Sequence, residues 1–250
     1  FQYTYRIGQF PRLDFFEKAG IDIKNDKQIF TNYVKAQKLL NQTNKSVKFF
    51  KTHSAYFDRK SDGATFSDLD NTLGAIYIVR DPRNVVISYS HHFQVTLDEA
   101  TKRICTNDLF IRRTEILPET FISSWKLNYL SWSRLGKRVL LVKYEDLVKN
   151  KKKTMLKIFK FFETLGMNKA SFDISKLNKI IKATEFDKMK DLENKQGFTE
   201  AMIDDDTGKR RPFFNLGPNN KWQNLLDEKN KSIIEKTFEA EMIKLGYLTI

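Results

Sequence analysis

The sequence predicts an α/β fold with three layers, an αβα arrangement in which helices cover both faces of a central parallel sheet. Three short apolar runs carry this prediction, at residues 47–50, 75–79 and 138–143. They alternate with longer segments whose apolar residues have helical spacing, a pattern typical of parallel strands joined by helical crossovers. Ligands of such sheets bind beyond the carboxyl ends of the strands, so the residues that follow these runs are the first candidates for a site.

Helical periodicity covers much of the remaining chain. Residues 1–46 and 94–120 are expected to be mostly helical, and residues 124–135 form an amphipathic segment in which Trp125 is expected to have a structural role. Residues 58–72 are rich in Asp, Ser, Asn and Gly, and we expect a surface loop there. Further helices are expected around residues 155–162, ended by Gly166, and at residues 173–183 and 227–245.

Composition limits the class of protein. The chain has 250 residues with 40% apolar content, enough for one large core, and we expect a single domain over residues 1–250. A net charge of +13 favours anionic partners such as nucleotides, although the lysines at 149 and 151–153 are more typical of a solvated face. Cys105 is the single cysteine, which excludes a disulfide within the chain and favours a reducing, cytoplasmic location.

The run at residues 75–79 ends in a candidate anion site. Arg80 follows the run, and Asp81 and Pro82 are typical first residues of a helix. A strand that leads into a helix in this way brings backbone N–H groups and a cation to one point, which suits a phosphate of a nucleotide. Ser88 lies eight residues after Arg80, about two helical turns further on. The alternative is a buried strand and helix with Arg80 as an ordinary surface cation.

One of the three histidines stands directly after a predicted strand. His53 follows the run at residues 47–50, two positions after Lys51. A histidine there can act as a general base near neutral pH, and a nearby lysine can neutralise developing negative charge. The alternative is a surface histidine in a polar loop. His91 and His92 fall near the end of a predicted helix, where they are expected to stabilise the helix rather than to catalyse.

Five motifs together resemble one protein family. In order along the chain they read FFKTH, YIVRDPRNVVISY, VKYEDL, TEFDKMKD and FFNLGPNNKW. In this order they resemble the sulfotransferases that use 3′-phosphoadenosine 5′-phosphosulfate (PAPS), from about residue 47 to the C-terminus. The resemblance implies a P-loop NTPase-like sulfotransferase fold and PAPS as co-substrate. It also implies 3′-phosphoadenosine 5′-phosphate (PAP) as product and no requirement for a metal.

The resemblance also implies a role for each matched residue. His53 matches the family's catalytic base, and Lys51 matches the lysine beside the transferring sulfuryl group. The remaining matches concern the nucleotide: Arg80 and Ser88 match the pair that binds the 3′-phosphate, Tyr144 matches a tyrosine near the adenine, and Thr184 and Phe186 match the segment that covers the adenine.

The last motif departs from the family pattern. The family commonly has Arg-Lys-Gly, then two further residues, and then Gly-Asp-Trp, and the two cations contact the 3′-phosphate. Asn215 and Leu216 stand at the positions of these cations, whereas Gly217 still offers its backbone N–H. Substitute cations are available nearby, at Lys209, Arg210 and Arg211.

A second departure concerns the loop that holds the 5′-phosphosulfate. The family has a Pro-Lys-Ser-Gly-Thr-Thr-like turn that wraps backbone N–H groups around the anion. The early segment at residues 7–15 lacks the Gly-Thr start of the helix. By the family's spacing the loop would precede the KTH cluster by roughly 60 residues, which is upstream of Phe1. We therefore expect the first strand and this loop to be missing, and the chain to be an N-terminally truncated fragment that is catalytically incomplete by itself.

The expected function is transfer of a sulfuryl group to the hydroxyl or amine of a small-molecule, lipid or carbohydrate acceptor, without a nucleic-acid partner. One alternative is a nucleotide-dependent kinase of related fold, which needs a metal, and Asp81 is the only tempting acidic metal partner. Another is a non-catalytic basic protein that binds polyanions and is indifferent to a 3′-phosphate. The pairing of Lys51 with His53 argues against it, since such binding needs no base.

Overall fold

The computed structural model describes residues 7–42, 47–59, 63–167, 174–204 and 207–249. The chain forms two compact units, each made of two segments. The first unit comprises Phe1–Ala75 and Thr106–Val139, and the second comprises Ile76–Cys105 and Leu140–Ile250. No helix in these described ranges is both long enough and apolar enough to cross a membrane.

The first unit contains short strands and helices. β1 pairs with β2 in parallel, with Gln9 opposite Lys51, whereas β3–β4 and β6–β7 are antiparallel pairs. In chain order the elements are β1 Gly8–Gln9, α1 Leu13–Lys18, α2 Asp26–Thr31, α3 Tyr33–Gln42, β2 Phe50–Lys51, β3 Asp58–Arg59, β4 Ala64–Thr65, β6 Phe110–Ile111, β7 Thr120–Phe121, α6 Trp125–Ser133 and the 3₁₀ turn η3 Gly136–Arg138.

Aromatic side chains build the core of the first unit. Tyr33 is fully buried, and its ring packs edge-on against Phe10, Phe16 and Phe57 with centroids 5.2–5.7 Å apart. Phe66 is also buried and meets both Tyr33 and Trp132. Edge-to-face pairs of this kind add stabilisation beyond the area that they bury.

Two expectations for the first unit need correction. The segment expected as a surface loop at residues 58–72 contains the β3–β4 pair, and it buries Ala64, Phe66 and Ser67 because Phe66 is needed in the aromatic core. Residues 106–120 were expected to be helical with a charged loop near Arg112, Arg113 and Pro118; they contain β6 and the start of β7 instead of a helix, and the expected loop lies between these two strands.

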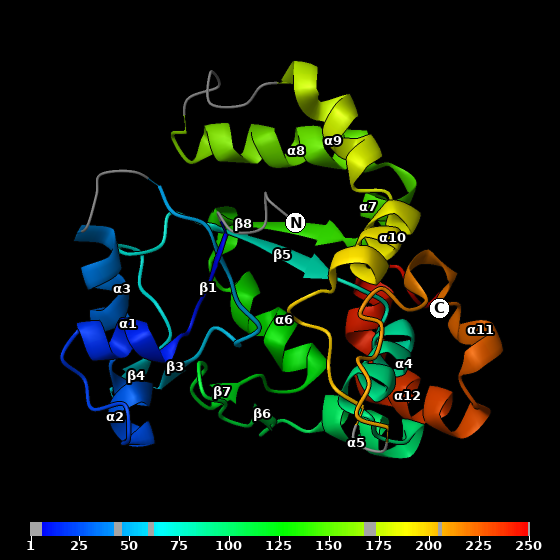
Figure 1. Cartoon of the computed structure of the whole chain (residues 1–250), viewed down its shortest axis with the longest axis horizontal. Coiled ribbons are helices and arrows are strands. Elements are labelled where there is room, and N and C mark those ends of the chain that lie inside the picture. The colour runs from blue at the N-terminus through cyan, green and yellow to red at the C-terminus, as the bar shows by residue number, and fades with distance from the viewer. Residues whose placement is uncertain (1–6, 43–46, 60–62, 168–173, 205–206, 250) are drawn as a thin grey trace. The chain divides into compact units, whose positions relative to one another are not determined.

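The second unit contains the paired strands β5 and β8. Figure 1 shows them side by side as arrows that point the same way, so the predicted α/β fold with parallel strands is confirmed. The described strands form two-stranded sheets. In chain order the elements are β5 Ala75–Val79, α4 Pro82–Phe93, α5 Leu97–Cys105, β8 Val139–Lys143, α7 Tyr144–Lys149, α8 Lys151–Thr164, η5 Ile174–Lys176, α9 Leu177–Ala183, α10 Phe186–Gln196, η6 Gly217–Asn219, α11 Trp222–Leu225 and α12 Glu228–Lys244.

Local signals explain where α4 begins and ends. The Asp81 side chain accepts a hydrogen bond from the Arg83 amide and caps the helix, and Pro82 occupies its first position. The helix ends at Gln94, which has φ +54°, in the left-handed region. On its inner face Val86 is fully buried, and α5 and α12 pack against the helix.

A buried ion-pair network holds the start of α4 in the second unit. The Arg83 guanidinium lies 2.7 Å from Asp81 and 2.6 Å from Glu235, and it donates to the Tyr247 carbonyl at 2.7 Å. Its central carbon lies 3.9 Å from the centroid of the Trp222 ring. The network joins α4 to α12 and to the C-terminal segment.

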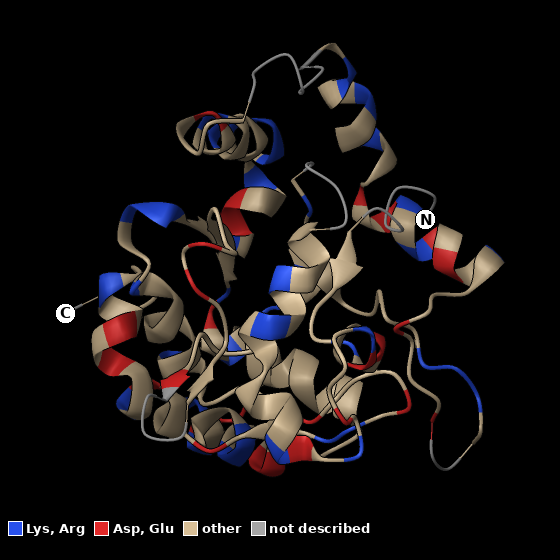
Figure 2. Cartoon of the chain, turned by 90° about the vertical axis from the view of Figure 1, so that its left-hand side faces the viewer, with Lys and Arg blue, Asp and Glu red and all other residues tan. Residues whose placement is uncertain are grey.

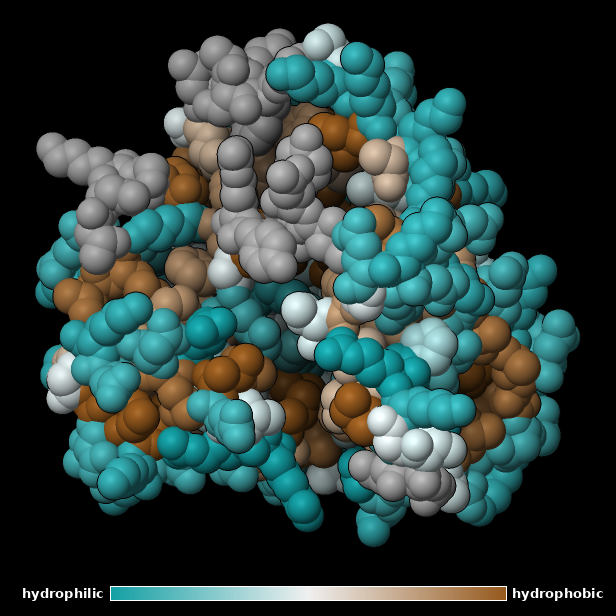
Figure 3. All heavy atoms as spheres, in the orientation of Figure 1, coloured by the Kyte–Doolittle hydropathy of each residue, from teal (hydrophilic) through white to brown (hydrophobic). Residues whose placement is uncertain are grey.

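The surface is mixed in charge and in polarity. Figure 2 shows Lys and Arg spread over many elements with Asp and Glu between them. Lys152 and Lys153 begin α8 as exposed residues, and Lys151 donates to the Thr184 carbonyl at 2.9 Å. Figure 3 shows apolar surface in separate patches between hydrophilic areas. The exposure of Lys152 and Lys153 agrees with the interpretation of this lysine run as a solvated face.

A half-buried tyrosine, Tyr247, makes the stability sensitive to alkaline pH. Burial raises the pKa of Tyr247, and the Glu145 carboxylate, which accepts a hydrogen bond from its hydroxyl at 2.9 Å, raises it further. The neutral phenol therefore stabilises the fold fully below about pH 10, the pKa of an exposed tyrosine, and this contribution is lost as the pH rises above that value. We expect the urea midpoint to fall above about pH 10, and to fall less steeply in Tyr247→Phe. An identical pH profile in the variant would contradict this assignment.

Candidate functional site

Arg80 is the centre of a group of predicted site residues in the second unit. Its Nη1 donates to the Ser88 hydroxyl at 3.4 Å, and its Nη2 donates to the Gly217 carbonyl at 3.1 Å. Its central carbon lies 4.2 Å from the centroid of the Tyr144 ring. The structure thus brings Ser88, Tyr144 and Gly217 together around the guanidinium group of Arg80.

Strand pairing explains this arrangement. Arg80 follows β5 and Tyr144 follows β8, so the pairing of the two strands places both residues at the same edge. Burial lowers the pKa of Arg80, whereas Tyr144 and Glu145 act to raise it. Arginine stays protonated in proteins, so this group presents a fixed positive charge with N–H donors. An anion is the chemical partner that suits it.

Gly217 permits a close approach that no other residue would allow. Its φ is +52°, and a Cβ atom there would lie 2.1 Å from a ring carbon of Phe186. Phe186 is the first residue of α10, and its ring lies 6.2 Å from that of Phe214. The turn that carries Gly217 is therefore packed between Arg80 and an aromatic ring.

Thr184 has its hydrogen-bond partners outside this group. Thr184 is exposed and follows the last residue of α9. Its hydroxyl donates to the Ile180 carbonyl at 2.9 Å. No hydrogen bond in the described ranges joins Thr184 to Arg80, Ser88 or Gly217. Its predicted contact with a nucleotide stays a prediction.

Two of the three substitute cations suggested by the sequence have other partners. Arg210 donates to the Phe198 carbonyl at 3.2 Å, and Arg211 pairs with Asp204 at 2.9 Å. A cation that the sequence analysis did not name lies beside Asn215: Lys190 on α10 places its Nζ 3.5 Å from the Asn215 carbonyl. Helix α10 itself was not predicted, which explains why this lysine was missed.

Two further residues shape the site and were also missed. Asn220 is 4% exposed, and its Nδ2 donates at 2.9 Å both to the Ser88 hydroxyl and to the Asn84 carbonyl. Glu193, also buried, accepts hydrogen bonds from the amides of Phe213 and Phe214 at 2.7 and 2.9 Å. It therefore fixes the segment that leads to Asn215. For Asn220, the sequence signal that could have pointed to its role is an asparagine where the family motif has a glycine.

The predicted catalytic residues lie in the first unit. Lys51 ends β2, and its carbonyl accepts a hydrogen bond from the Phe10 amide at 2.9 Å. His53 is exposed, and its backbone carbonyl accepts a hydrogen bond from Asn128 at 3.2 Å. The next residue, Ser54, accepts at its carbonyl from the Trp132 indole at 2.9 Å. The backbone around His53 is thus anchored through its carbonyls, while the residue is accessible to solvent.

The other two histidines lie at the end of α4. His91 Nε2 lies 3.0 Å from the Pro212 carbonyl, and the His92 ring packs edge-on against Phe93 and Phe213. These contacts hold the segment at Pro212 and Phe213 against the helix. A stabilising role agrees with the expectation for this pair.

An early segment forms a strand, a turn and a helix. Residues 7–15, which lack the Gly-Thr helix start, contain β1 and the beginning of α1, and β1 is the parallel neighbour of β2. Asp14, in the first turn of α1, pairs with Arg12 at 2.9 Å and with Lys18 at 3.3 Å. Burial tends to raise the pKa of Asp14, but these two cations lower it overall.

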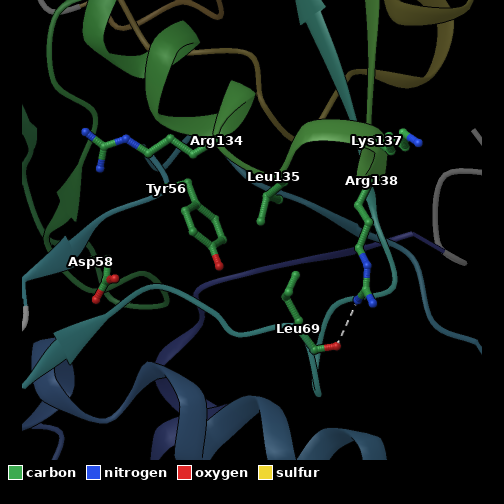
Figure 4. Close-up of a pocket in the computed structure, with 7 residues that line it drawn as sticks. All are labelled: Tyr56, Asp58, Leu69, Arg134, Leu135, Lys137 and Arg138. Atoms are coloured by element: carbon green, nitrogen blue, oxygen red, sulfur yellow. Dashed lines mark hydrogen bonds between the residues drawn. The ribbon is translucent and has the colours of Figure 1, made fainter.

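Each unit also has an open groove. The groove of the first unit, about 470 Å³, is lined by Tyr56, Leu69, Leu135 and Arg138 among others, and Arg138 donates to the Leu69 carbonyl (Figure 4). The groove of the second unit, about 460 Å³, includes Asn220. The predicted catalytic residues line neither of these two grooves.

Comparison with known proteins decides the family. The family model described as the Sulfotransferase domain matches residues 4–246. The chain belongs to the sulfotransferase domain family. The match covers nearly the whole chain, including the early strand and helix at residues 8–18.

Curated sulfotransferases from mammals are among the relatives. Sulfotransferase 1E1 of Rattus norvegicus is 27% identical over 173 residues, which cover 67% of this chain and 54% of that protein. Sulfotransferase 1C2 of Oryctolagus cuniculus is 24% identical over 192 residues, 69% of this chain and 56% of that protein. The sulfotransferase chain thus spans about half the length of these curated relatives.

Solved structures agree with the predicted sulfotransferase fold. Mouse sulfotransferase SULT7A1 complexed with PAP has a TM-score of 0.55 at 22% identity, over 83% of this chain and 69% of that one. Retinol dehydratase in a complex with retinol and PAP has a TM-score of 0.54 at 17% identity, over 96% of this chain and 65% of that one. The sulfotransferase fold predicted from the motifs is confirmed.

Proposed function

We propose that the protein of this chain transfers a sulfuryl group from PAPS to a hydroxyl or amine of a small-molecule, lipid or carbohydrate acceptor. The observation that carries the proposal is the gathering of Ser88, Tyr144 and Gly217 around the half-buried guanidinium group of Arg80. A fixed guanidinium beside a hydroxyl group fits a phosphate group. Membership of the sulfotransferase family and two relatives solved with PAP support this choice of nucleotide.

Each nucleotide-binding residue has a proposed role. Arg80 and Ser88 bind the 3′-phosphate, and Tyr144 contacts the nucleotide near the adenine. Phe186 offers an aromatic face for stacking, and Thr184 lies two residues before it. Gly217 contributes its backbone N–H. Because Asn215 and Leu216 carry no charge, Arg80 has a larger share of the phosphate binding than in the usual motif.

His53 and Lys51 carry the proposed chemistry. His53 takes the proton of the acceptor hydroxyl or amine while the acceptor atom forms its bond to sulfur. The bond between sulfur and the phosphate oxygen breaks, and the departing phosphate keeps the electron pair. Lys51 stabilises the negative charge on the transferring group. PAPS supplies the activated sulfuryl group, and positioning supplies most of the rate.

A thermal-shift titration tests the nucleotide part of the proposal. We expect PAP at a hundredfold excess over its Kd to raise the melting midpoint by about 5 to 10 °C, because it binds only the folded state. AMP, which lacks the 3′-phosphate, should raise it much less. The difference should vanish in Arg80→Ala and persist in Arg134→Ala, a control in which an exposed arginine of the first unit is removed.

Other outcomes of the same titration contradict the proposal. Equal shifts with PAP and AMP would mean that the Arg80 group does not recognise the 3′-phosphate. A shift with ATP and Mg²⁺ but not with PAP would favour the kinase alternative. A salt-sensitive shift with heparin alone would favour the polyanion-binding alternative.

A further inference from the structure

The Ser88 hydroxyl accepts two hydrogen bonds. Arg80 Nη1 lies 3.4 Å from its oxygen and Asn220 Nδ2 lies 2.9 Å from it. A guanidinium and an amide NH₂ group can only donate, and a hydroxyl oxygen has two acceptor positions. Both acceptor positions of Ser88 are therefore filled by these two donors.

The neighbouring carbonyl fixes the orientation of the Asn220 amide. Nδ2 also lies 2.9 Å from the Asn84 backbone oxygen, which can only accept. A flipped amide would place two oxygens at this distance without a hydrogen between them. The NH₂ group must therefore face Asn84 and Ser88, and it uses one hydrogen for each. The amide oxygen of Asn220 is buried and has no partner in the described ranges.

This arrangement determines where the Ser88 hydrogen points. Within the described ranges, no protein group accepts a hydrogen bond from the Ser88 hydroxyl. With its acceptor positions filled, the hydroxyl can only donate to a further group. Ser88 and Arg80 thus form a pair of donors that offers no lone pair to a ligand.

We propose that Asn220 is a positioning residue that makes Ser88 an obligate donor and sets the site for a fully deprotonated phosphate group. This inference rests on the proposed function, since the phosphate is the 3′-phosphate of the nucleotide. A phosphate oxygen without a proton can only accept, which matches the two donors, and phosphate loses its second proton near pH 6. The matched motif has a glycine at position 220 and cannot orient the serine in this way. In this chain, Asn220 strengthens a site that lacks the two motif cations.

A double-mutant cycle tests the role of Asn220. Calorimetry at pH 7.5 would compare PAP binding to the unmodified chain, Ser88→Ala, Asn220→Ala and the double variant. We expect Ser88→Ala to weaken binding by about tenfold to a hundredfold and Asn220→Ala by about tenfold. The double variant should be no weaker than Ser88→Ala, because Asn220 acts through Ser88. Binding of AMP should change little in all three.

Two further variants serve as a control and as a replacement for Asn220→Ala. Asn219→Ala removes the neighbouring amide, which is exposed, and should leave PAP binding unchanged. Asn220→Gly restores the residue of the family motif and serves if Asn220→Ala folds poorly. It should show the same loss of PAP affinity. Melting curves of all variants verify that the fold is retained.

The outcomes separate this inference from the proposed function. Additive losses in the double variant, or equal losses for PAP and AMP, would show a merely structural Asn220 and overturn the inference alone. Retained PAP affinity in Asn220→Ala, with a loss in Ser88→Ala, would also overturn it alone. If the unmodified chain does not prefer PAP over AMP, the proposed function is wrong and the inference falls with it.

Discussion

Replacing Arg83 with methionine is expected to lower the free energy of unfolding by about 3–5 kcal/mol, as found when one partner of a buried ion pair is removed. Arg83 and Asp81 are each 5% exposed, so the variant leaves the Asp81 carboxylate buried without its cation. It also removes the hydrogen bond to Glu235 and the contact with the Trp222 ring. The midpoint of urea unfolding, with an unchanged slope, measures the effect.

Arg103 provides a matched control within the same unit. It pairs with Glu99 at 2.8 Å one helical turn away, and both side chains are well exposed. Exposed pairs of this kind contribute little, so Arg103→Met should cost about 0.5 kcal/mol. If Arg83→Met cost no more than this control, the network around Asp81 would not hold the start of α4.

The second large effect is expected at His53. In the protein that carries this chain, His53→Ala should lower the turnover number by about a hundredfold to ten-thousandfold, because the acceptor would lose its general base. PAP affinity should be unchanged. The backbone carbonyl of His53, not its ring, accepts the hydrogen bond from Asn128, so this contact survives the substitution. Formation of sulfated product and calorimetric PAP binding measure the two effects separately.

His91 serves as the control for this experiment. It contacts the Pro212 carbonyl at the end of α4, and nothing assigns it a proton-transfer role. His91→Ala should therefore retain turnover within a few-fold. Normal turnover in His53→Ala would show that another group takes the proton.

The parts of the site that the sequence predicted depend on local signals. The apolar run at residues 75–79 is followed by Arg80 and then by Asp81 and Pro82, and β5 and α4 have the bounds that these residues indicate. The proximity of Arg80 and Tyr144 followed from one further rule, since each residue comes directly after a strand of a parallel pair. Cap residues and strand ends are encoded within a few positions of the chain.

The parts that were missed depend on contacts between distant segments. Helix α10 has a strongly charged sequence, yet its Glu193 binds the amides of Phe213 and Phe214 about twenty residues later. The β3–β4 pair forms where Phe66 joins the aromatic core, which outweighs the loop composition of that segment. β1 lies within residues 1–46, which were expected to be mostly helical, and it forms by pairing in parallel with β2. The spacing of apolar residues within these segments does not predict such distant partners.

The two units alternate along the chain, and this has a consequence for any attempt to divide the gene. The chain passes from one unit to the other after Ala75, after Cys105 and after Val139. No single cut therefore yields a polypeptide that holds the second unit whole and leaves out all of the first unit, which carries His53. Recombination at a single crossover would always divide at least one of the two units, because each unit is made of two segments that are separated along the chain by a segment of the other.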